Sequence, residues 1–106
     1  MKLLTKEILK KLPALYSQEK TPDPIVQVKF FLTFSNWTWY GLEYDPVEGR
    51  FFGLVQGHEE ELGYFTLDEL LSVRNVVGLG VERDKFFDPC PLSQVQQKEQ
   101  GVYHGL

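Results

Sequence analysis

The chain has 106 residues and a formal net charge of −4, a length that suits one domain. Its hydrophobic fraction of 42% and charged fraction of 25% are typical of a globular domain and exclude a low-complexity chain. No apolar run approaches the roughly 18 residues that would span a bilayer, and charges interrupt any signal-peptide core near the N-terminus. We therefore expect a cytoplasmic protein without membrane contact, which the single cysteine, Cys90, also favours.

The first predicted element is a short helix that ends at about Leu12. Thr5 can cap its free backbone N–H groups, and Glu7 lies in the first turn, where negative charge suits the helix dipole. Residues 1–12, the N-terminal segment, contain one glutamate and four lysines: Lys2, Lys6, Lys10 and Lys11. A solvated helix face is the simpler interpretation of these lysines, and a nucleic-acid contact is the alternative.

Four runs with the alternating apolar pattern of strands follow. They are residues 25–33, 37–44, 50–56 and 61–65. Turn residues separate them, including a proline and a glycine in the turn between Asp45 and Gly49. Connections this short require antiparallel neighbours, so the sequence predicts an antiparallel meander. Gly53, in the middle of its strand, indicates a bulge or a close approach of another backbone.

A second helix is predicted from Leu67 to about Arg74. Thr66 and Glu69 have the spacing of a capping box, and Phe65 and Leu70 have the spacing of a hydrophobic staple. We expect six apolar residues of the strands and this helix to be buried: Phe30, Phe52, Leu54, Leu62, Leu70 and Leu71.

The predicted fold is a single α+β domain over residues 1–92. It has a four-stranded antiparallel β-meander with an N-terminal helix and a helix that follows the last strand. Residues 76–81 are expected to form a loop or a short extended piece. Residues 93–106 are rich in glutamine and poor in apolar residues, so we expect a flexible tail there.

Catalytic and metal-binding patterns are weak in this sequence. His58 stands beside three glutamates, but zinc sites use three or four ligands at characteristic spacing. Cys90 could act as a nucleophile only with a base brought to it by the fold. Glu43 and Glu61 could pair across strands, yet glycosidase chemistry needs a cleft. We expect no catalytic residue, metal or cofactor, and a small enzyme is the least favoured alternative.

Two interpretations of the aromatic residues stay open. On strict alternation, Phe31, Trp37, Trp39 and Phe51 fall on one parity set of neighbouring strands, and Glu43 shares the face of the two tryptophans. If both helices cover the opposite face, these rings form an exposed patch of the kind that marks interfaces. If one helix covers each face, the rings are core, which the two-sided apolar pattern of residues 50–56 favours.

The charge distribution suggests a binding role. Residues 43–69 carry eight acidic residues and one arginine, which disfavours direct contact with nucleic acid. Carboxylates on a rigid hairpin could instead occupy a basic groove of a partner protein and compete there with phosphate. A solvated sheet surface is the simpler interpretation. The expected partner-binding residues are Glu43, Glu48, Glu59, Glu60 and Glu61, with Trp37 and Trp39 as anchors.

A resemblance to a known family rests on five segments, which occur in this order: KLLTKEILKKLPALY, VKFF, SNWTWY, RFFGLVQGHEEELGYFTLDEL and VERD. Together they resemble a bacterial family catalogued as domain of unknown function 2958, over about residues 2–88. The segment after Phe87 does not resemble the family. Members are encoded by plasmids, phages and integrative elements, often near antirestriction and conjugation genes. The resemblance implies no catalytic residue.

These observations lead to one hypothesis and one rival. The hypothesis is a small non-enzymatic binding protein of a mobile genetic element, such as a counter-defence inhibitor that presents an acidic surface to a host or defence protein. The rival is a nucleic-acid-associated accessory domain of a plasmid or phage that uses the N-terminal lysines.

Overall fold

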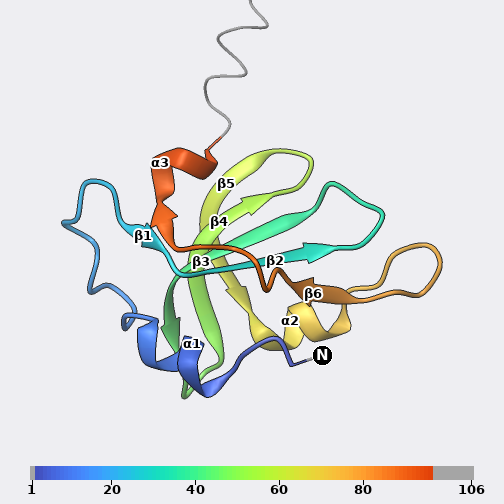
Figure 1. Ribbon diagram of the computed structural model, residues 1–106, viewed down its shortest axis with the longest axis horizontal. Coiled ribbons are helices and arrows are strands. Elements are labelled where there is room, and N and C mark those ends of the chain that lie inside the picture. Colours follow the sequence, from blue (N-terminus) through green and yellow to red (C-terminus); the bar gives the residue numbers. More distant parts are fainter. Residues whose placement is uncertain (1, 97–106) are drawn as a thin grey trace, which may run out of the picture.

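The computed structural model describes residues 2–96. Its main feature is a five-stranded antiparallel sheet in the order β5-β4-β3-β2-β6 (Figure 1). The strands of this sheet are β2 (Val28–Leu32), β3 (Thr38–Asp45), β4 (Arg50–Gln56), β5 (Glu60–Thr66) and β6 (Val81–Arg83). A smaller sheet pairs β1 (Ile25–Val26) with β7 (Cys90–Pro91). The helices of this range are α1 (Lys6–Lys11), α2 (Leu67–Ser72) and α3 (Leu92–Val95).

The α+β class and the antiparallel meander of β2 to β5 are confirmed. The expected number of four strands is wrong, because β6 adds to the outer edge of β2. The chain returns there after α2 through an antiparallel bridge between Arg74 and Gly80. A strand of three residues is too short for periodicity to reveal.

Both predicted helices begin at the capping residues that the sequence indicated. The Thr66 hydroxyl accepts the Glu69 N–H at 3.0 Å, and the Glu69 carboxylate accepts the Thr66 N–H at 2.9 Å. This is the predicted capping box. The helix ends at Ser72, two residues before the expected end, and buries Leu70 but leaves Leu71 half exposed. In α1 the Thr5 hydroxyl accepts the Ile8 N–H at 3.3 Å.

One face of the sheet, here called the helix face, carries the larger core. Phe51 lies at its centre, fully buried, with ring contacts to Phe30 at 5.5 Å, Tyr44 at 4.5 Å and Phe65 at 5.0 Å. Side chains of α1, of α2 and of the residues that flank these helices belong to this core or pack against it: Leu4, Ile8, Leu12, Leu67, Leu70 and Val73. The helix face is therefore closed.

The opposite face, here called the pocket face, carries a second and smaller core. Its buried residues are Val26, Tyr40, Leu42, Leu54 and Leu92. The β1–β7 sheet and α3 supply the cover. This cover does not extend across β5, where Leu62 is 49% exposed. The expectation that Leu62 is buried was wrong for this reason.

A β-bulge in β3 changes which side chains share a face. The β3–β4 register shifts between Gly41 and Glu43. After the shift, Glu43 pairs with Phe52 on the pocket face and Tyr44 pairs with Phe51 on the helix face. The expected grouping of Glu43 with the tryptophans is wrong, because an extra residue in one strand reverses the alternation beyond it. Gly53 sits opposite the bulge, where a Cβ would lie 1.8 Å from the Tyr40 carbonyl oxygen.

The C-terminal part of the described chain packs on the domain. Leu92, at the start of α3, is buried, and the Ser93 N–H and hydroxyl donate to the Asp23 carboxylate at 3.0 and 2.7 Å. Residues 97–106, most of the expected flexible tail, lie outside the described residues. Within residues 2–96, no helix has the length and apolar character needed to cross a membrane.

Candidate functional site

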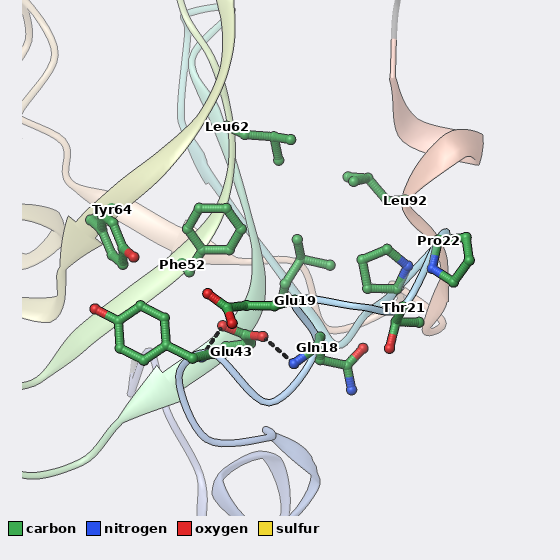
Figure 2. A pocket seen from close by; sticks show the side chains of 12 residues that line it. Gln18, Glu19, Thr21, Pro22, Glu43, Phe52, Leu62, Tyr64 and Leu92 are labelled. Atoms are coloured by element: carbon green, nitrogen blue, oxygen red, sulfur yellow. Dashed lines mark hydrogen bonds between the residues drawn. The ribbon is translucent and has the colours of Figure 1, made fainter.

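Glu43 is a buried carboxylate that binds a distant loop. Its side chain is 4% exposed, and its two oxygens accept the backbone N–H groups of Tyr16 and Gln18, each at 2.8 Å (Figure 2). Tyr16 has a positive φ of 70°, a conformation that costs about 1–3 kcal/mol in a residue with a side chain. The two charge-assisted hydrogen bonds offset that cost and the cost of burying the carboxylate. Glu43 therefore positions the loop.

This loop forms one wall of a pocket of about 430 Å³ on the pocket face. Phe52, Leu62 and Tyr64 line it from β4 and β5, while Pro22 and Leu92 lie across from them (Figure 2). Most of the lining is apolar, and the charged side chains that contribute to it are Glu19 and Glu43. An apolar pocket with a few polar groups is the usual form of a binding site in proteins.

Tyr64 joins β5 to the loop at one end of the pocket. A hydrogen bond with the Tyr16 hydroxyl raises the pKa of Tyr64, and desolvation adds to this shift. The Arg50 guanidinium packs on the Tyr64 ring, 5.2 Å from its centroid. The Arg50 Nε is buried without a hydrogen-bond partner among the described residues. Arg50 does not line the pocket.

The acidic residues of the segment 43–69, here called the acidic block, are divided in space. Glu59 and Glu61 are exposed at the β4–β5 turn, and the adjacent Glu60 is half-buried and accepts a hydrogen bond from the Gln56 side chain at 2.8 Å. Glu48 is exposed in the β3–β4 turn, at the other end of the sheet (Figure 1). We call Glu59, Glu60 and Glu61 the acidic turn.

Glu43 lies in neither of these two exposed turns. It is buried and its oxygens hold backbone N–H groups, so it is not presented to a partner. Glu61 pairs with Val55, whose side chain packs in the core of the helix face. The suggested carboxylate pair of Glu43 and Glu61 is therefore wrong, because the two side chains lie on opposite faces of the sheet.

The tryptophans are mainly core residues. Trp39 is 7% exposed, and Trp37 stacks on it with ring centroids 5.9 Å apart. Phe30, and not Phe31, is the cross-strand neighbour of Trp39, which sequence alternation could not show without the register. A Cβ on Gly57 would lie 2.3 Å from the Trp37 ring, so the turn backbone covers part of that ring. Trp39 is not accessible as an anchor, and Trp37 is accessible only in part.

The residues considered for catalysis do not form a site. Cys90 lies in β7, where burial raises the pKa of its thiol and the Asp23 carboxylate adds to the shift, so the thiol is a weak nucleophile. His58 is exposed in the β4–β5 turn and contacts the Trp37 ring edge-on at 5.4 Å. Within residues 2–96, no three His, Cys, Asp or Glu side chains are grouped to hold a metal.

Comparison with known proteins places this fold in a family. A family model described as "Protein of unknown function (DUF2958)" matches residues 3–100. The chain belongs to this family. The match includes every element of the pocket and continues past Phe87, where the resemblance noted from the sequence ended. The family's description assigns no activity to these elements. No curated protein and no solved structure matches the chain significantly.

Sequence reasoning missed Tyr16, Leu62, Tyr64 and Phe52 as site residues. Tyr16 and Glu43 are 27 residues apart in the chain, and no local sequence pattern indicates that they are in contact. One signal was present. Glu43 interrupts an apolar strand that contains Gly41, opposite another glycine-containing strand, and such a combination is typical of a bulge that redirects a side chain.

Proposed function

We propose that the protein is a small, non-enzymatic binding protein of the cytoplasm that docks on a basic surface of another protein. One observation carries the proposal. The exposed carboxylates are those of Glu59, in the turn before β5, and Glu61, near the start of β5, the same strand whose Leu62 and Tyr64 are half exposed beside an apolar pocket. A half-exposed apolar area next to charged groups is typical of a protein interface.

Electrostatics supports a basic partner. The chain has a net charge of −4, and Glu59 and Glu61 of the acidic turn are exposed, so their carboxylates can steer encounter with a positive surface without a large desolvation cost. Such a contact speeds association and weakens as salt screens it. A nucleic-acid-binding protein offers a basic surface of this kind.

The mobile-element setting of the resembling proteins is the reason to propose a host or defence protein as the partner. Direct contact with nucleic acid through the lysines of the N-terminal segment is the competing function, because Lys2, Lys6, Lys10 and Lys11 are all exposed. One experiment separates the two functions.

The full chain, immobilised, captures partners from a lysate of a bacterial host at low and high salt, and captured proteins are identified by mass spectrometry. The test variant is Glu59→Gln combined with Glu61→Gln. The matched control is Glu48→Gln, an exposed carboxylate in the turn at the other end of the sheet. We expect one partner to be retained at low salt by the wild type and the control, and to be lost from the test variant.

Two results would count against the proposal. If the partner is captured equally at low and high salt, and equally by the wild type and the Glu59→Gln, Glu61→Gln variant, binding through the acidic turn is excluded. Direct binding of labelled DNA or RNA, lost when the four lysines are replaced by glutamine, would favour the nucleic-acid function.

A further inference from the structure

We propose that β5 is a strand-addition site, at which an extended basic segment of the partner pairs with the outer edge of β5 and inserts a lysine or arginine side chain into the pocket. This inference rests on the proposed binding function and specifies the chemistry of the partner.

The backbone of β5 offers hydrogen-bonding groups at its outer edge. Its ladder with β4 continues into bonds from the Leu67 N–H to the Gly49 carbonyl at 2.8 Å and from the Gly57 N–H to the Glu59 carbonyl at 3.0 Å. In an antiparallel ladder such bonded pairs alternate with non-bonded pairs. Gly63 therefore faces β4, while Leu62 and Tyr64 direct their N–H and C=O groups outward. In the described part of the chain, no strand pairs with this edge.

Apart from the charged residues Glu60 and Glu61 at its start, the edge lacks the features that usually protect an exposed strand. β5 has seven residues, contains no proline and pairs with β4 without a register shift. The opposite edge of the sheet, β6, has only three residues. Long, regular edges are templates for another strand, and addition of a peptide strand to such an edge is a common mode of recognition.

The pocket lies where an added strand would place side chains. Leu62 and Tyr64 have the same parity in β5, so both side chains lie on the pocket face. Alternate residues of an added strand would project onto this face too. One of them could enter the pocket beside Phe52, with Leu92 on the far wall. Backbone bonds would then supply affinity, and the pocket would supply selectivity.

The lining chemistry selects a cation on an apolar stem. The aliphatic part of a lysine or arginine can pack on Leu62 and Leu92, and its charge can interact with the ring of Phe52. Glu19 supplies an exposed carboxylate at the pocket wall, whereas the Glu43 oxygens are already bonded to backbone N–H groups, and none of the lining residues is a lysine or arginine. The acidic turn extends the negative charge along the edge. A second copy of this chain would present Leu62, Tyr64 and glutamates here, and no cation.

Leu62→Pro tests the backbone contact directly. Because the Leu62 N–H points outward, proline removes the edge donor without removing a bond to β4, and edge strands tolerate proline in this position. A phage-displayed library of random octapeptides is selected on the full chain after depletion on the Leu62→Pro variant. We expect enriched peptides with lysine or arginine at alternate positions.

Fluorescence anisotropy of an enriched peptide then measures affinity. We expect binding to weaken about tenfold or more in Leu62→Pro, since one lost hydrogen bond with strain is worth on the order of 1.4 kcal/mol. Leu62→Lys should also weaken binding, whereas Leu71→Lys, at a matched exposure of 50% against 49%, should not. N-methylation of the peptide backbone should abolish binding when it is placed at every second residue whose N–H faces β5. At the residues between them, N-methylation should leave binding unaffected. This readout does not depend on folding of any variant.

Three results would overturn the inference: no enrichment, enriched peptides without basic residues, or indifference to N-methylation. Sedimentation that shows a dimer of the free chain, dispersed by Leu62→Pro, would assign the edge to self-association instead. A lysate partner that needs Glu59 and Glu61 but is retained by Leu62→Pro would leave the binding function standing and exclude strand addition.

Discussion

The two faces of the sheet are built by different means. On the helix face, Phe51 contacts three aromatic rings and the helices close the surface. On the pocket face, a loop held by Glu43 and a short C-terminal segment cover β3 and part of β4, and β5 remains open. The closed face follows regular alternation. The open face depends on a bulge, a positive-φ tyrosine and a buried carboxylate, and departures of this kind concentrate at functional sites.

The largest expected difference in the free energy of unfolding is between substitutions at two adjacent residues of β4. Phe51→Ala should lower the free energy of unfolding by about 3–5 kcal/mol, because it opens a cavity in a fully packed core. Phe52→Ala should cost clearly less, because Phe52 is partly exposed beside the pocket. Urea unfolding at 25 °C measures both. Equal losses would show that the two faces are packed alike.

Glu43 provides the next comparison. Glu43→Gln should lower the free energy of unfolding by about 1–3 kcal/mol, because the amide NH₂ would face a backbone N–H donor of Tyr16 or Gln18. The control Glu61→Gln, on an exposed side chain, should change it by about 0.5 kcal/mol or less. Unfolding curves measured at neutral pH would contradict this role for Glu43 if the two variants were equally stable.

The cross-strand pair of Leu54 and Leu62 provides a third comparison. Leu54→Ala should cost about 2–5 kcal/mol, whereas Leu62→Ala should cost less than about 1 kcal/mol, because half of its surface already contacts solvent. Thermal unfolding gives the order of stabilities. A Leu62→Ala loss as large as that of Leu54→Ala would mean that β5 is covered in solution.

The smallest effect concerns the link between the loop and β5. Tyr16→Phe should move the pKa of Tyr64 down toward its ordinary value, because the hydrogen bond with Tyr16 is the main cause that raises it. Titration of the ¹³Cζ signals of labelled tyrosine by NMR reports this shift. Tyr44→Phe, on the helix face, should leave Tyr64 unchanged. An unaltered Tyr64 titration in Tyr16→Phe would exclude the link.

Local signals explain which parts of the fold were predictable. The capping box at Thr66 and the turn that ends at Gly49, with a φ of 66°, involve neighbouring residues, so the sequence shows them directly. The strand β6, the bulge and the contact of Glu43 with Tyr16 depend on residues far apart in the chain. The sequence could not show that the acidic block is divided, because its glutamates lie at opposite ends of the sheet only after the strands have folded into hairpins.

The openness of β5 is tested most directly by residue-resolved amide hydrogen exchange. In the free chain we predict fast exchange at Leu62 and Tyr64, whose N–H groups point outward, and slow exchange at Gly63 and Phe65, whose N–H groups bond to β4. Addition of a selected basic peptide should then slow the Leu62 and Tyr64 amides. Equal protection of all four amides in the free chain would contradict an open edge, because it would mean that β5 is already paired.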